Sequence, residues 1–170
     1  FILFPSASLK VKKWPIDRCA EIVDRIYEKT KLPIVLCGTE HDRIDAKEMV
    51  GLIKSDVPIV DMIGKTNVMQ LATLIGKARF VITNDTSVYH ISVAKGVDTF
   101  LLCGGYVYKR FAAYNYPGYK TPVLINSYMS CYDCNNNCTR HFDQTYPCVE
   151  AVSVDMVWDA FVKKLPELTI

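Results

Sequence analysis

Residues Val81–His90 read VITNDTSVYH, and this stretch decides the fold of the chain. Its apolar start predicts a buried strand, which ends at Asp85 and is followed by a turn and a helix. Asp85, Thr86 and Ser87 are all residue types that cap helix N-termini. A helix start presents unpaired N–H groups and a partial positive charge, so a phosphate fits there. His90 follows Thr86 by one helical turn and can face the same group.

The same residues also fit a purely structural role. Asp and Thr are common at helix starts, where they usually only cap. Edges of the strand–turn–helix kind occur throughout α/β domains. The choice between capping and ligand binding therefore depends on the rest of the chain.

Short apolar runs alternate with amphipathic segments. We expect strands at Phe1–Pro5, Ile34–Cys37, Ile59–Met62, Phe80–Thr83, Thr99–Cys103 and Pro122–Ile125, and helices at Pro15–Lys29, Asp42–Lys54, Asn67–Lys77, Ser87–Lys95 and Val154–Leu165. Asn67 and Gln70 have the spacing of a capping box. The alternation predicts an α/β fold, a parallel sheet with helices on both faces, whose ligands bind outside the carboxyl ends of the strands.

The composition is that of a globular protein. The chain has 170 residues, of which 50% are hydrophobic and 22% are charged, and its net charge is +2. This balance argues against a nucleic-acid partner, and no apolar run has the length of a membrane span. We expect a single domain over residues 1–170, located in the cytoplasm. Because the first residue is Phe1, inside an expected strand, we interpret the chain as a fragment of a larger protein.

Two further loops at expected strand ends carry polar residues. Ser6–Lys13 brings hydroxyl groups and lysines to one strand end, where they fit a phosphate; a solvated basic loop is the alternative. Gly38–Asp42 ends in an acid that fits a ribose hydroxyl or, equally, the N-cap of the next helix. Neither a Walker pattern nor GxGxxG is present, so no P-loop or standard dinucleotide site is indicated.

Four cysteines gather late in the chain: Cys131, Cys134, Cys138 and Cys148. Their spacing resembles structural zinc and iron–sulfur ligand sets but fits no standard zinc finger. Unliganded thiols in a packed loop, a metal site and disulfides all remain open. The other cysteines are expected to be small hydrophobic residues of the core: Cys19, Cys37 and Cys103.

Together these segments resemble the C-terminal domain of the family 9 glycosyltransferases, the ADP-heptose–lipopolysaccharide heptosyltransferases. The resemblance covers essentially the whole chain and rests on segments in the family's order: Pro5–Ser8, Lys12–Pro15, Gly38–Asp42, Asp85–His90, Leu102–Gly104 and the cysteine group. It implies the C-terminal, Rossmann-like half of a GT-B enzyme, without the N-terminal domain that binds the acceptor.

The resemblance also implies roles for the first two loops. Ser8 and Lys12 would contact the phosphates of an ADP-sugar, and Asp42 would bind its ribose. No cofactor or metal is then required, because fixed donors stabilise the negative charge that develops on the leaving ADP. The general base would lie in the absent N-terminal domain, so no catalytic residue is assigned in this chain.

The loop after the strand at Phe80–Thr83 would complete this site. Thr86 and Ser87 would donate backbone N–H groups to the diphosphate. Asp85 would orient the loop or touch the sugar, and His90 would lie beside the phosphates. Ser87 stands where the family signature has glycine, so its side chain narrows the space for a diphosphate.

The leading hypothesis is the donor-binding domain of an inverting, metal-independent glycosyltransferase. It would transfer heptose or a related sugar from an ADP-sugar to lipopolysaccharide core, in peripheral contact with the inner face of the cytoplasmic membrane. The alternatives are a non-catalytic nucleotide-binding module and an interaction module built on zinc or another metal at the cysteine group.

Overall fold

A single parallel sheet organises the molecule. The computed structural model describes residues 1–168, except for the side chains of residues 107 and 109. Within these residues the strands are β1 (Ile2–Phe4), β2 (Ile34–Leu36), β3 (Ile59–Asp61), β4 (Phe80–Asn84), β5 (Asp98–Leu102) and β6 (Val123–Ile125). They pair in the order β3-β2-β1-β4-β5-β6, and every pair is parallel. The predicted parallel sheet is confirmed.

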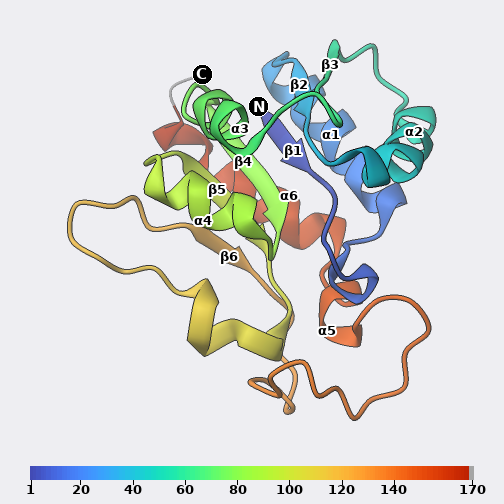
Figure 1. Cartoon of the computed structure of the whole chain (residues 1–170), viewed down its shortest axis with the longest axis vertical. Helices are drawn as coiled ribbons and strands as arrows, with labels where there is room; N and C mark the ends of the chain where they lie inside the picture. The colour runs from blue at the N-terminus through green and yellow to red at the C-terminus, as the bar shows by residue number, and fades with distance from the viewer. Residues whose placement is uncertain (169–170) are drawn as a thin grey trace.

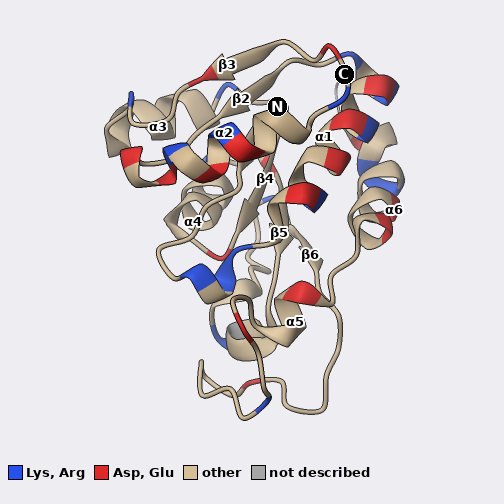
Figure 2. Ribbon diagram, turned by 90° about the vertical axis from the view of Figure 1, so that its right-hand side faces the viewer, with Lys and Arg blue, Asp and Glu red and all other residues tan. Residues whose placement is uncertain are grey.

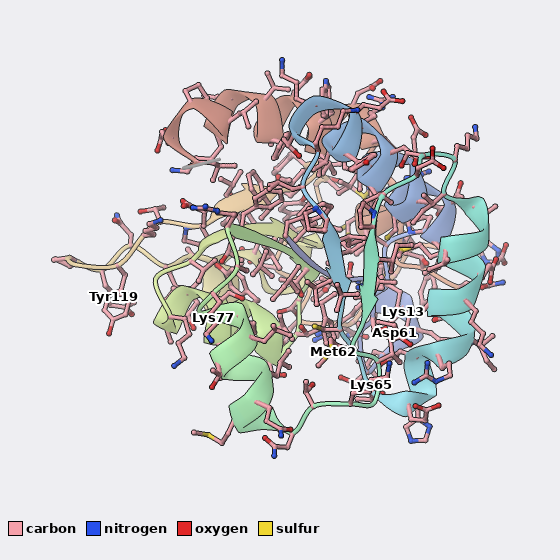
Figure 3. The ribbon with its side chains drawn as sticks, turned by 90° about the horizontal axis from the view of Figure 1, so that it is seen from above. Lys13, Asp61, Met62, Lys65, Lys77 and Tyr119 are labelled. Carbon is pink, nitrogen blue, oxygen red and sulfur yellow. The ribbon has the colours of Figure 1, made fainter. Side chains whose placement is uncertain are left out.

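Helices cover both faces of this sheet, as expected. They are α1 (Ile16–Thr30), α2 (Arg43–Leu52), α3 (Val68–Ile75), α4 (Ser87–Ala94), α5 (Pro147–Glu150) and α6 (Val154–Lys164). Seen from above, blue α1 and red α6 lie on one side of the strands and green α3 on the other (Figure 3). In the described part of the chain, no helix combines the length and the apolar character needed to cross a bilayer.

The two faces have separate cores. On the α1 and α6 side, Phe80 packs against Phe161 with ring centroids 5.3 Å apart. On the α3 and α4 side, Val81 packs with Ile75 and Val88. Since β4 and β5 are buried at every position, they have the near-continuous apolar sequences typical of central parallel strands. The remaining cysteines, Cys19, Cys37 and Cys103, are fully buried as expected.

Most of the expected elements occur within a few residues of their predicted bounds. The capping box is confirmed, since Asn67 and Gln70 each accept a hydrogen bond of 2.9 Å from the other's backbone N–H. Helix α5 has no counterpart among the expected elements, because four residues are too few to show a helical period. The π-helical turn Tyr108–Ala112 has none either.

The order of strands brings two loops together. The chain starts at β1 in the middle of the sheet, proceeds through β2 to β3 at one edge, and then returns to β4 on the other side of β1. The loops that leave β1 and β4 therefore emerge side by side in the lower half of the molecule in Figure 1. Open α/β sheets bind their ligands at such a switch point.

Candidate functional site

A cleft of about 480 Å³ opens at the carboxyl ends of β1, β2 and β4. Four residues of the predicted site line it: Ser8, Asp42, Thr86 and Ser87. Lys10 and Lys13, which belong to the predicted basic loop but were not assigned individual roles, line it as well. The cleft therefore unites hydroxyl groups, two ammonium groups and a helix start, a set of donors suited to an anionic ligand.

The helix start at this cleft is well formed. Thr86 is the N-cap of α4, and its Oγ1 accepts a hydrogen bond of 3.3 Å from the backbone N–H of Val88. Ser87 is the first residue of the helix and its side chain is exposed. The predicted strand, turn and helix are thus all present, and the positive end of α4 faces the cleft.

Asp42 is held in place by Thr39. One carboxylate oxygen, Oδ2, accepts hydrogen bonds of 2.8 Å from both the backbone N–H and the hydroxyl of Thr39. Burial alone would raise the pKa of Asp42, but the bonds from Thr39 and the nearby ammonium of Lys13 hold the pKa below its usual value. The other oxygen, Oδ1, lies 3.6 Å from Lys13 Nζ on the side of the cleft.

Asp42 does not cap the following helix in the way that the sequence suggested. A 3-10 turn, η2 (Glu40–Asp42), precedes α2, and the carboxylate is directed back to Thr39 rather than forward to the first N–H groups of α2. A second hydroxyl, that of Ser6, is buried near Asp42 and forms no hydrogen bond of normal geometry with the described residues. Its proximity also helps to hold the pKa of Asp42 below the usual value.

The lysines after β1 divide between two environments. Lys10 and Lys12 lie on a 3-10 turn, η1 (Lys10–Lys12), which forms a basic block on the ribbon (Figure 2, blue), and Lys13 directly follows the turn. Residues three apart eclipse one another on such a turn, so Lys10 and Lys13 share the cleft. Lys13 also pairs with Asp45 of α2 at 2.7 Å. Lys12 instead lies beside the cleft lining, 3.0 Å from Asp85 Oδ2.

His90 is also outside the cleft lining. Its Nδ1 lies 2.7 Å from the hydroxyl of Tyr114, with which it shares a hydrogen bond. The ring of Tyr89 packs edge-on against both of these residues. The structure thus brings Ser8, Asp42, Thr86 and Ser87 to one cleft, and places Lys12, Asp85 and His90 around it.

The four late cysteines line one small cavity. Cys131, Cys134, Cys138 and Cys148 all line a cavity of about 10 Å³, between the turn that follows β5 and the start of α5. All four are free thiols. No three His, Cys, Asp or Glu side chains of the described residues are arranged to hold a metal ion.

Family membership follows from the sequence. The chain matches the model of glycosyltransferase family 9 (heptosyltransferase) over residues 1–136. It belongs to this family. The matched residues include the whole cleft and the first two of the clustered cysteines, Cys131 and Cys134. No curated protein sequence matches the chain.

Solved structures of family 9 and related enzymes have the same fold. ADP-heptose lipopolysaccharide heptosyltransferase II of E. coli superposes with a TM-score of 0.77 at 16% identity, over 98% of this chain and 46% of the other. A family 9 glycosyltransferase of Veillonella parvula superposes with a TM-score of 0.72 at 20% identity, over 98% of this chain and 46% of the other. The dodecameric, iron-containing heptosyltransferase TibC, in complex with ADP-D-beta-D-heptose, superposes with a TM-score of 0.69 at 13% identity. This superposition covers 99% of this chain and 45% of the other. The chain thus spans less than half the length of each.

Proposed function

We propose that this chain is the donor-binding domain of an inverting, metal-independent glycosyltransferase. The enzyme transfers heptose or a related sugar from an ADP-sugar to lipopolysaccharide core. The observation that carries the proposal is the cleft at the switch point, where Lys10 and Lys13 face the N-terminus of α4 in a family 9 domain. The E. coli heptosyltransferase WaaC with ADP and TibC with an ADP-heptose support this choice of donor.

The arrangement explains how a diphosphate would be bound. The backbone N–H of Ser87 and the hydroxyl of Ser8 donate to phosphate oxygens, and Lys13 supplies charge. Asp42 Oδ1, on the cleft side, accepts from a ribose hydroxyl. Cleavage of the bond between sugar and ADP leaves negative charge on the diphosphate, and these fixed donors stabilise that charge more strongly than solvent would.

The acceptor and the general base are assigned to the portion of such an enzyme that this chain does not span. The structural neighbours are more than twice as long as the part that superposes. We place the recognition of lipopolysaccharide core there, together with the base that takes the proton of the acceptor hydroxyl. An enzyme with this acceptor works in the cytoplasm, at the inner face of the cytoplasmic membrane.

Calorimetric titration of ADP, UDP and GDP tests the proposal. We expect ADP to bind most tightly, and Ser87→Tyr to abolish binding because the ring fills the cleft. Thr73→Tyr is the matched control, since Thr73 is an exposed hydroxyl residue of α3, away from the cleft. Absence of binding by all three nucleotides, or equal losses in the two variants, would contradict the proposed site.

A second role is proposed for the cysteine group, as a structural metal site. Four free thiols line one cavity, and the heptosyltransferase TibC is iron-containing. Because no three of the described side chains are arranged to hold an ion, metal binding would have to draw the thiols closer together. Tetrahedral thiolate sets bind zinc or iron, and the metal would brace the loop rather than take part in transfer. Protein purified without chelator should then contain one zinc or iron per chain, and Cys134→Ser should lose it. Less than stoichiometric metal in the wild-type protein would remove this role.

The main alternative is a non-catalytic nucleotide-binding module. It shares the cleft and the preference for ADP, and differs in activity. The whole parent protein, assayed with an ADP-sugar and lipopolysaccharide core, distinguishes the two: transfer supports the enzyme, whereas tight ADP binding without transfer supports the module.

A further inference from the structure

Three neighbouring strand ends bring together Lys12, Asp85 and Tyr106. Lys12 follows β1, Asp85 follows β4, and Tyr106 follows β5. The ammonium of Lys12 lies 3.0 Å from Asp85 Oδ2 and 4.6 Å from the centroid of the Tyr106 ring. The side chains of Lys12 and Asp85 are only 17% and 12% exposed, so their pair is largely shielded from solvent.

The hydroxyl of Tyr106 is the unusual member of this group. Tyr106 is fully buried, and its hydroxyl forms no hydrogen bond of normal geometry with the described residues. Leaving such a group unpaired destabilises the fold, so an unpaired buried hydroxyl needs a reason. Burial, followed by the charge of Asp85, raises the pKa of Tyr106. The phenol therefore stays protonated, and its O–H can donate a hydrogen bond.

Packing, and not the hydroxyl, holds Tyr106 in this position. Gly104 leaves room for the ring: a Cβ at residue 104 would lie 2.1 Å from it. The backbone N–H of Asn135 donates a hydrogen bond of 3.0 Å to the carbonyl of Tyr106. The ring of Tyr146 packs against that of Tyr106, with the two ring centroids 5.5 Å apart. Residues of the segment that carries the late cysteines thus fix a phenol beside the Lys12–Asp85 pair. Its hydroxyl lies near Asp85 but forms no hydrogen bond of normal geometry while Lys12 holds that carboxylate.

We propose that Tyr106 is a positioning residue for diphosphate binding, which donates a hydrogen bond to Asp85 when a phosphate draws the ammonium of Lys12 away. This role rests on the proposed function. In the free protein Asp85 is neutralised by Lys12. A bound diphosphate competes for the same ammonium, and Asp85 would then be left as a shielded charge without a partner.

A shielded carboxylate that loses its cation raises the free energy of the complex. Any such cost at Asp85 weakens diphosphate binding by the same amount. The hydroxyl of Tyr106 offsets this cost, because a hydrogen bond to a charged acceptor is stronger than one between neutral groups. The exchange keeps every polar group of the trio paired in the bound state. It also explains why an unpaired hydroxyl is retained in the free state.

The test compares Tyr106→Phe with Tyr146→Phe. Each change removes only a hydroxyl, but that of Tyr146 donates to the carbonyl of Asn136 at 3.1 Å, away from the lysine pair. We expect Tyr106→Phe to weaken ADP binding about tenfold with an unchanged or higher Tm, since the free protein loses no hydrogen bond. Tyr146→Phe should show the opposite pattern, a lower Tm with unchanged ADP affinity.

Each result decides the role. The two opposite patterns establish it, because a merely structural tyrosine would lower the Tm and not the affinity. Wild-type affinity in Tyr106→Phe overturns the role of Tyr106 and leaves the nucleotide site intact. Failure of the wild-type protein to bind ADP overturns the proposed function, and with it the role that rests on it.

Discussion

The side-chain amide of Asn84 donates a hydrogen bond of 2.6 Å to the carbonyl oxygen of Pro5. Its Oδ1 accepts a second bond, of 3.1 Å, from the backbone N–H of Trp14. Asn84 ends β4, whereas Pro5 and Trp14 stand at the two ends of the loop that follows β1. One fully buried side chain therefore fixes both ends of the loop that forms the wall of the cleft.

Replacement of Asn84 by alanine should destabilise the protein strongly. The change leaves the carbonyl of Pro5 and the N–H of Trp14 buried without these partners, and each costs about 1–3 kcal/mol. We expect the free energy of unfolding to fall by about 2–4 kcal/mol in urea titrations. Asn67→Ala, at the exposed N-cap of α3, should lose only about 1 kcal/mol. Equal losses in the two variants would mean that Asn84 does not hold the loop.

Two glycines should respond oppositely to alanine. At Gly104 a Cβ would lie 2.1 Å from the ring of Tyr106, so Gly104→Ala forces this ring or the turn to move. At Gly51, near the end of α2, a Cβ meets nothing within 4 Å, and alanine favours the helix by up to about 1 kcal/mol. Thermal melting should show a lower Tm for Gly104→Ala and an equal or higher Tm for Gly51→Ala. A Tm for Gly104→Ala at or above that of the wild type would contradict the packing.

The fold could be predicted from the sequence because its signals are local. Buried parallel strands are short apolar runs, and helices repeat their apolar residues every three or four positions. Those rules located the strand that ends in Asn84 and the helix that starts at Ser87. Short irregular turns have no such period, and for this reason η1 and α5 were not foreseen.

The site was only partly predictable, since its side-chain directions depend on those turns. The resemblance suggested Lys12 for the phosphates, and in the free protein its ammonium pairs with Asp85 beside the cleft. The sequence did not show that Lys10 and Lys13 line the cleft itself. The spacing of three residues between Lys10 and Lys13 was the feature of the sequence that could have indicated that both face the same side. Nothing local in the sequence linked Tyr106 to Lys12 and Asp85, because only the pairing of β1 with β4 and of β4 with β5 brings these residues together.

Removal of the charge of Lys13 should weaken nucleotide binding. Lys13 lines the cleft, and a hydrogen bond from an ammonium to a phosphate contributes about 1.5–3 kcal/mol. Lys13→Met should therefore reduce the affinity for ADP at least about tenfold in calorimetric titrations. Lys31→Met is the control, since Lys31 follows α1 and lies over the ring of Tyr27. Comparable affinities in these two variants would place the diphosphate elsewhere.

Asp42 should make the stability of the protein sensitive to acid. Its pKa in the folded state is below the value in the unfolded chain, because hydrogen bonds from Thr39 and the charge of Lys13 outweigh the effect of burial. A lowered folded pKa contributes stability that is present above the unfolded pKa, about 3.9, and is lost as the pH falls through the folded pKa.

The measurement is urea unfolding between pH 6 and pH 2. Asp42→Asn should be less stable than the wild type at pH 6, and the gap should narrow below about pH 4, where the wild-type carboxylate takes up its proton. Asp61 is the reference: its pKa is also lowered, through the N–H of Ile63 and through Arg43, but its side chain is 43% exposed. Solvent screens such a group, so Asp61→Asn should show a smaller gap. A gap for Asp42→Asn that stays constant across this range would show that its carboxylate contributes through packing and not through its charge.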